Sequence, residues 1–217
     1  MPTDALAAVV IDPQRVFVIL FLMLGPVKLL VPFVEMSRQS DPAFRRVLAN
    51  RAIMFSAAAL LLAGAIGDKM VANFGIPLPV LALAGGLILF LVALNTILEQ
   101  FAAPSLLKPE GAPRDLHALT TRLAFPTIVT PSGVAAIIVF CALVKNDIGM
   151  LSAIGGITLG ILLLDWLAML FAESILRWGR VALQLFAVIL GVIQVSLGLQ
   201  LMLRGLSLSG VLPISAG

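Results

Sequence analysis

Charged side chains are scarce in this chain of 217 residues: only 12% are Asp, Glu, Lys or Arg, whereas 61% are hydrophobic. An ordinary soluble domain carries about 25% charged and about 45–50% apolar residues. A chain with so little charge cannot cover its apolar side chains with a polar surface in water. A bilayer removes that requirement, so the composition predicts an integral membrane protein.

Cysteine and histidine occur once each, which excludes several classes of site. Cys141 has no second cysteine with which to form an intrachain disulfide. His117 lies in a polar stretch, so neither a histidine-based zinc site nor a Ser–His pair can form at membrane depth. The sequence also contains no P-loop and no G-x-G-x-x-G motif. We therefore expect no enzyme, no catalytic residue, no metal site and no cofactor.

Apolar runs divide the chain into six expected membrane spans, since about 20 apolar residues cross a hydrocarbon core of ~30 Å. The runs cover 16–34, 52–67, 75–98, 123–144, 148–172 and 181–203. The longest polar stretch, 99–122, contains three prolines and separates the third run from the fourth. The expected units are a first three-helix repeat over 1–98, a cytoplasmic linker over 99–122 and a second three-helix repeat over 123–217.

Lysine and arginine are unevenly shared between the two sides of the membrane that these spans define. The richer side carries Arg38, Arg45, Arg46, Arg51, Lys108, Arg114, Arg122, Arg177 and Arg180. The other side carries only Arg15, Lys69, Lys145 and Arg204. The positive-inside rule makes the richer side cytoplasmic and places both termini outside, in the periplasm if the membrane is a bacterial inner membrane. The net charge of +3 thus reflects topology, and no nucleic-acid partner is expected.

A shift of the sequence by 105 residues aligns the two halves without a gap. The matched pairs are Pro26 with Pro131, Asp68 with Glu173, Gly86 with Gly191 and Asn95 with Gln200. The shift also superimposes the first three runs on the last three. Because each half has an odd number of spans, the halves enter the membrane in opposite directions. We expect an all-α membrane fold of about six helices in a 3+3 inverted-topology repeat, the architecture of many secondary transporters.

Proline and glycine interrupt the first and fourth runs at corresponding positions. The first break lies at Gly25 and Pro26, with a further Pro32, and the second lies at 130–133, after Pro126. Such breaks free backbone groups that need partners in lipid, and paired breaks point to a transporter site. The expected substrate-binding residues are Gly25, Pro26, Lys28, Thr130, Pro131, Ser132, Gly133 and Gln194. Ordinary proline kinks remain the alternative.

Two ionisable residues, Lys28 and Asp165, lie inside apolar runs at similar depth. A charge at the centre of a membrane helix costs about 2.5–3.5 kcal/mol on insertion scales, so such residues usually face a partner. We expect either a buried ion pair between them, or Lys28 receiving a substrate carboxylate while Asp165 handles a proton. The alternatives are that Asp165 reaches the cytoplasmic interface and that Lys28 only caps freed carbonyls.

Small residues predict close helix contacts at two places. Gly156 and Gly160 form a GxxxG pattern, and Gly86, Gly191 and Gly198 provide further small faces. Gln194 lies near mid-membrane, where interhelical hydrogen bonding is the simpler role and substrate contact the other.

Four segments resemble the MarC family, also described as small neutral amino acid transporters, within the larger LysE group of exporters. The matching features are Phe74-Gly75-Ile76 with Ala84-Gly85-Gly86, Gly191 with Gln200 and Gly205, Pro126 with Pro131, and Pro26 with Phe33 and Ser37. The resemblance covers about residues 16–206. It implies six helices in a 3+3 inverted repeat, with the broken helices meeting at a central site for a small solute such as an amino acid.

The chain departs from the family pattern at that implied site. Gly25 stands where the family usually has Asn, Lys28 replaces Gly or Thr, and Thr130-Pro131-Ser132 replaces Gly-Pro-Gly. Pro32 lies one place later than the family's second proline. A cation is gained where an amide is lost, which favours an anionic or carboxylated solute over a neutral one.

The resulting expectation is a secondary transporter or exporter of a small metabolite, an amino acid or another carboxylated solute, by alternating access in a multi-pass inner membrane protein. Its partners would be that solute and membrane lipid, with homo-oligomerisation open. Two alternatives remain, a non-transporting scaffold or subunit, and a membrane enzyme acting on a lipid phosphate through Lys28.

Overall fold

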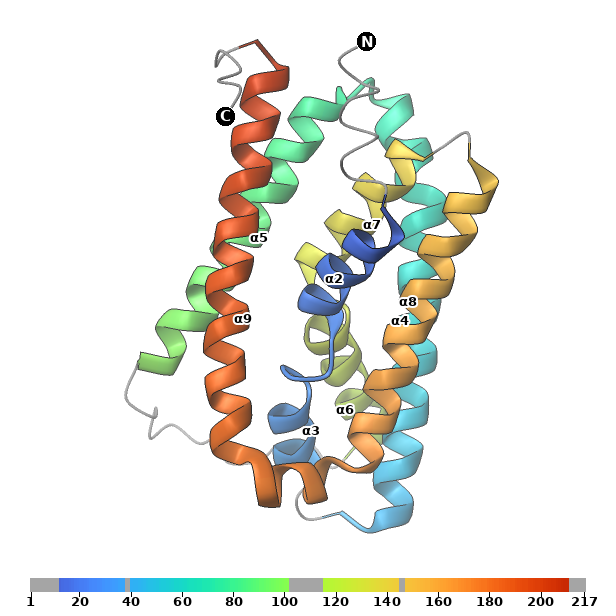
Figure 1. Ribbon diagram of the computed structural model, residues 1–217. Helices are drawn as coiled ribbons and strands as arrows, with labels where there is room; N and C mark the ends of the chain where they lie inside the picture. The colour runs from blue at the N-terminus through green and yellow to red at the C-terminus, as the bar shows by residue number, and fades with distance from the viewer. Residues whose placement is uncertain (1–11, 38–39, 102–114, 145–146, 211–217) are drawn as a thin grey trace.

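The computed structural model describes residues 12–37, 40–101, 115–144 and 147–210, and within these ranges every regular element is helical (Figure 1). In chain order they are α2 (Pro13–Leu24), α3 (Leu30–Ser37), α4 (Pro42–Asn73), α5 (Leu78–Phe101), α6 (Leu116–Arg122), the π-helix η1 (Leu123–Ile128), α7 (Pro131–Leu143), α8 (Ile148–Leu170) and α9 (Ala172–Leu208). The prediction of an all-helical membrane fold is confirmed.

Polar residues with short side chains set where several of these helices begin. The carboxylates of Asp12 and Asp115 each accept from the backbone N–H two residues later, at 3.1 Å. Asp147 accepts from the N–H of Met150 at 3.0 Å. Each carboxylate satisfies an N–H group that the first helical turn cannot pair. The α4–α5 turn instead uses Gly75, whose φ of +61° suits glycine.

Three described helical segments are long and apolar enough to cross a membrane: Pro42–Asn73, Ile148–Leu170 and Leu185–Leu208. A fourth span results if Leu116–Ile128 and Pro131–Ala142, which are bent by 59°, count as one. The second and sixth runs are therefore parts of helices that extend well beyond the apolar stretches, since α4 begins at Pro42 and α9 at Ala172.

Of the other two expected spans, the first is broken, whereas the third is one continuous helix of 24 residues. The first is divided into α2 and α3 because the chain breaks over the residues between them, around Pro26. The third corresponds to α5, in which the described apolar stretch is Pro79–Asn95. The expected linker over 99–122 is helical at both described ends, because α5 continues to Phe101 and Asp115 caps α6; its centre lies outside the described residues.

The two broken helical segments lie in the middle of the bundle, between the pair α4–α8 and the pair α5–α9 (Figure 1). Helices α4 and α8 run in opposite directions, as do α5 and α9 (Figure 1). Contacts between the halves are reciprocal: α4 packs on η1 and α7 as α8 packs on α2 and α3, and α5 packs on α7 as α9 packs on α3. Reciprocal contacts and opposed directions are what an inverted repeat requires.

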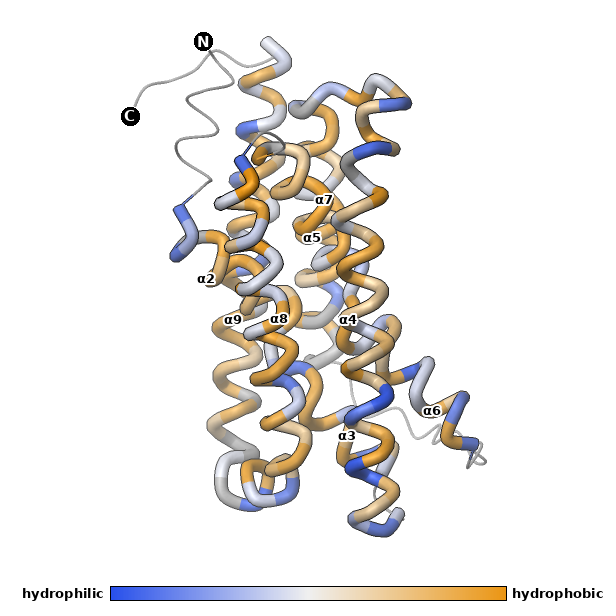
Figure 2. The backbone as a smooth tube through the Cα atoms, turned by 90° about the vertical axis from the view of Figure 1, so that its right-hand side faces the viewer, coloured by the Kyte–Doolittle hydropathy of each residue, from blue (hydrophilic) through white to orange (hydrophobic). Residues whose placement is uncertain are grey.

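Apolar side chains cover the outside of the bundle as well as its core. Met54, Phe55, Leu62, Leu185 and Phe186 are each more than half exposed. Hydrophobic stretches run along most of α4, α8 and α9 (Figure 2). A surface of this kind suits a hydrocarbon environment, where exposed apolar groups cost nothing.

Glycine allows α5 and α9 to approach closely, as the small-residue pattern predicted. A Cβ atom built on Gly198 would lie 2.7 Å from the backbone nitrogen of Phe90, and one on Gly86 would lie 2.8 Å from the carbonyl oxygen of Gly198. The prediction for Gly156 and Gly160 was wrong within the chain, since a Cβ atom on either meets no atom within 4 Å. Their spacing correctly predicted that both glycines lie on one face of a helix. It could not predict whether that face packs against another helix of the chain.

Candidate functional site

The first break leaves two carbonyl groups at the end of α2 without their usual helical donors. The last regular bond runs from the N–H of Gly25 to the carbonyl of Phe21, at 2.8 Å. The carbonyl of Leu22 would next accept from residue 26, but Pro26 has no N–H. The carbonyl of Met23 loses its donor because the helix does not continue. Such groups need other partners at membrane depth.

Gln194, on α9, supplies the partner for Leu22. Its side-chain Nε2 donates to the Leu22 carbonyl, and its Oε1 accepts from the Nζ of Lys28 at 2.8 Å. Gln194 is only 1% exposed, whereas Lys28 is half-buried. One amide thus joins both sides of the first break to α9. A hydrogen bond to a charged group contributes about 1.5–3 kcal/mol.

The second break is built on Thr130, the N-cap of α7. Its Oγ1 accepts from the N–H of Gly133 at 3.0 Å and lies 3.2 Å from the Oγ of Ser132. The same hydroxyl donates to the carbonyl of Met23 at 3.3 Å. Because that proton is committed to Met23, the Ser132 hydroxyl is the donor in its contact with Thr130. Thr130 therefore satisfies the Met23 carbonyl at the first break and caps α7, the helix that follows the second break.

Two glycines fit the breaks because a side chain would collide there. A Cβ atom on Gly25 would strike the carbonyl oxygen of Phe21, and one on Gly133 would strike the side chain of Leu24. Gly25 is the C-cap of α2 and Gly133 lies in the first turn of α7, so both collisions would occur at the breaks. Glycine at position 25, where the MarC pattern usually has Asn, therefore fits a backbone that leaves no room for a side chain.

The structure brings most of the predicted substrate-binding residues to one place. Gly25, Pro26 and Lys28 form the first break, and Thr130, Ser132 and Gly133 form the second, in contact through Met23. Pro131 is exposed and occupies the first position of α7, where a missing N–H costs nothing.

Asp165, on α8, forms no hydrogen bond with this cluster. Its side chain is fully buried, and neither carboxylate oxygen has a hydrogen-bond partner among the described residues. The expected ion pair with Lys28 is therefore not formed, because the Lys28 ammonium bonds to Gln194 instead. Nor does the carboxylate reach the surface of the bundle, because the side chain is fully buried. Similar depth on two helices did not indicate which way either side chain faces.

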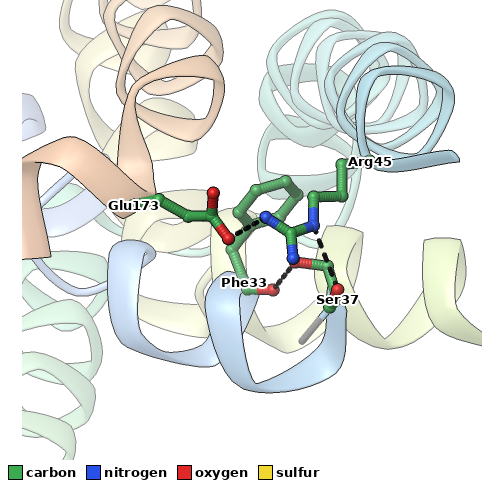
Figure 3. A network of polar contacts seen from close by, with 4 residues as sticks. All are labelled: Phe33, Ser37, Arg45 and Glu173. Carbon is green, nitrogen blue, oxygen red and sulfur yellow. Dashed lines mark hydrogen bonds and ion pairs between the residues drawn. The ribbon is translucent and has the colours of Figure 1, made fainter. Parts of the chain in front are cut away.

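A polar network ties three helices together at the end that carries α3 and the α8–α9 junction (Figure 3). Arg45, near the start of α4, forms an ion pair with Glu173 in the first turn of α9. The Nε of Arg45 also donates to the carbonyl of Ser37 at 3.1 Å, and the Ser37 hydroxyl donates to the carbonyl of Phe33 at 2.7 Å. Segments expected on one side of the membrane therefore meet at one end of the bundle.

A cavity of about 100 Å³ lies between α2, α5, α7 and α9. Met23 and Ser132, from the two breaks, lie on its wall together with Gln200 and Arg204 of α9. The sequence reasoning missed Arg204 as a site residue and counted it only toward topology. The spacing of Gln194, Leu197, Leu201 and Arg204, which places them on one helical face, was the signal available.

Comparison with known proteins agrees with this architecture. A profile described as MarC family integral membrane protein matches residues 13–209. The chain belongs to the MarC family. A similar member is UPF0056 membrane protein MJ1677 of Methanocaldococcus jannaschii, 27% identical over 192 residues that cover 86% of this chain and 92% of that protein. UPF0056 inner membrane protein YhgN of Escherichia coli is 26% identical over 134 residues, 62% of this chain and 66% of its own. No solved structure matches the chain.

The chain is thus a MarC family integral membrane protein whose two helix breaks meet at its centre. The cation that distinguishes the site, Lys28, is held by Gln194 rather than by an acid.

Proposed function

We propose that this MarC protein is a secondary transporter of a small carboxylated solute, with the solute carboxylate bound at Lys28. The observation that carries the proposal is the Lys28–Gln194 hydrogen bond. Gln194 orients the ammonium but leaves its charge uncompensated, since an amide is neutral. A half-buried cation between two helix breaks is a receptor for a solute anion.

The polar network and the cavity support transport by alternating access. Arg45 links α3 and α4 of the first half to Glu173 of the second half at one end of the bundle. The cavity lies toward the other end, where Arg204 follows Gln194 along α9. We assign this arrangement to the outward-facing state, in which the Arg45–Glu173 pair closes the cytoplasmic side.

Asp165 has the properties of a coupling group in this scheme. An ionised carboxylate without partners is costly at membrane depth. The group therefore carries a proton in this conformation or gains a partner in another one. We propose that Asp165 takes up and releases the proton that accompanies the solute.

The membrane and orientation belong to the same proposal. The described basic residues Arg45, Arg46, Arg51, Arg122 and Arg177 belong to segments that the positive-inside rule makes cytoplasmic. The Escherichia coli relative is named as an inner membrane protein. We propose an inner membrane location with both termini in the periplasm, and solute and lipid as the partners.

Flux into proteoliposomes tests the proposal. Purified protein is reconstituted, and uptake of labelled amino acids and organic acids is measured for wild type, K28A and R46A. Arg46 is an exposed cation on α4 and serves as the matched control. We expect wild type and R46A to move at least one carboxylated solute and K28A to move none. A membrane scaffold would move no solute in any of the three, and that result would remove the proposal.

A further inference from the structure

The cavity between α2, α5, α7 and α9 has chemistry of its own beyond the Lys28 site. Most of its wall is aliphatic or aromatic, with contributions from Ile19, Leu89, Val139, Phe140 and Leu197. Apolar walls of this kind bind the hydrocarbon part of a ligand. A cavity of about 150 Å³ is large enough for benzene. About 100 Å³ therefore suits a short, branched hydrocarbon group.

The polar side chains of the wall are not evenly distributed. Ser132 lies at the start of α7, next to the breaks, whereas Gln200 and Arg204 lie farther along α9. Ten residues separate Gln194 from Arg204, which is about 15 Å along a helix. Leu197 and Leu201 occupy the same face between them and also line the cavity. One face of α9 therefore leads from Arg204, through an apolar stretch, to the amide that holds Lys28.

Arg204 is the one charged residue among the described residues that line the cavity, and none of these lining residues is acidic. The buried carboxylate of Asp165 is on α8, which contributes no residue to the wall. A solute anion would meet Arg204 and then Lys28. A solute ammonium would meet no acid in this wall.

Backbone carbonyls at the first break do not replace the missing acid. The carbonyls of Leu22 and Met23 are the natural acceptors for an ammonium group at a broken helix. Gln194 already donates to the first and Thr130 to the second. Each of these carbonyl oxygens already accepts one hydrogen bond, and an α-amino group entering this site would also face the Lys28 ammonium.

From these observations we propose that the cavity is an outer binding site for a short, branched aliphatic monocarboxylate that lacks an amino group. Arg204 binds the carboxylate first, the apolar wall binds the hydrocarbon chain, and Lys28 is the second cation on the path inward. This inference rests on the proposed transport function and names its substrate class.

Four probes that share a carbon skeleton test the charge requirement on the full-length protein in nanodiscs. They are isovalerate, valine, isoamyl alcohol and isovaleramide, compared by thermal stabilisation and by competition for uptake. We expect isovalerate to stabilise the protein and to compete at concentrations at least about tenfold lower than the alcohol and the amide, as loss of one charge-assisted hydrogen bond implies. Valine keeps the carboxylate, and we expect it to compete more weakly than isovalerate because its ammonium faces the cations of Arg204 and Lys28. Equal or stronger effects of valine would overturn the inference and leave the transport proposal standing.

Two substitutions test the site itself. R204Q should weaken isovalerate binding by about tenfold, whereas R46Q, at an exposed cation on α4, should not change it. V139A enlarges the cavity and should shift the preferred acid from isovalerate toward longer chains such as hexanoate. Unchanged affinity in R204Q, or an unchanged chain-length preference in folded V139A, would contradict the assignment. If no probe binds or moves in wild type, the assigned substrate class is wrong; the transport proposal itself fails only if the wider panel of amino acids and organic acids is not moved either.

Discussion

The ammonium of Lys28 donates to the side-chain oxygen of Gln194 at 2.8 Å, across 166 residues of sequence. The other end of the same amide donates to the carbonyl of Leu22, which Pro26 leaves without a helical donor. One buried glutamine therefore repairs the first helix break and positions the cation that follows it. Removal of this amide should affect the stability and the function of the protein together.

The substitution Gln194→Leu should destabilise the folded protein and abolish transport. It leaves the Leu22 carbonyl and the Lys28 ammonium without partners, and an unsatisfied buried polar group costs about 1–3 kcal/mol. Thermal unfolding in detergent and flux in proteoliposomes measure the two effects. Ser196→Ala is the matched control, since Ser196 is exposed on the same helix and bonds only to the carbonyl of Val192. Equal stability of Q194L and S196A would contradict this role.

Much of this centre could be predicted from sequence, because proline and glycine act through local backbone chemistry. The breaks at Pro26 and Pro131 follow from a missing N–H, and the depth of Gln194 follows from counting residues. The partner of Lys28 could not be predicted, because depth does not give the rotation of a helix about its axis. For the same reason the expected pair with Asp165 was wrong and the GxxxG face of Gly156 was misassigned.

Gly198→Ala and Gly156→Ala should have opposite effects on stability. A methyl group at position 198 would lie 2.7 Å from the backbone of Phe90, so α5 and α9 must separate, at a cost of about 1–3 kcal/mol. A methyl group at position 156 meets nothing within 4 Å, and alanine favours the helix by up to about 1 kcal/mol. Thermal unfolding of both variants in one detergent makes the comparison. A stable G198A would show that the α5–α9 contact is looser than described.

Charge reversal at the Arg45–Glu173 end of the bundle should shift the balance between the two transport states that we propose. R45E and E173R each replace the Arg45–Glu173 attraction with repulsion, whereas the double variant restores a pair. An exposed ion pair of this kind contributes about 0.2–1 kcal/mol, so we expect a change of about fivefold or less. Labelling of a cysteine introduced beside the network, in a C141S background, reports opening. Equal labelling of single and double variants would argue against a gate here.

Asp165→Asn should preserve folding and abolish the dependence of uptake on an imposed pH gradient. The asparagine side chain is similar in size and carries no proton that it can release. The solute should then still exchange across the membrane without being concentrated. The measurement is uptake with and without a pH gradient in wild type and D165N. If a gradient drives D165N as strongly as wild type, Asp165 does not couple transport to protons.

The most direct test of the account is whether Lys28 touches the carboxylate of the solute. Isothermal titration of wild type and Lys28→Gln in nanodiscs compares isovalerate with isovaleramide, which has the same shape and no charge. We predict that wild type binds the acid at least about tenfold more tightly than the amide, and that K28Q reduces this preference to the part that Arg204 contributes. An undiminished preference for the acid in folded K28Q would contradict the account.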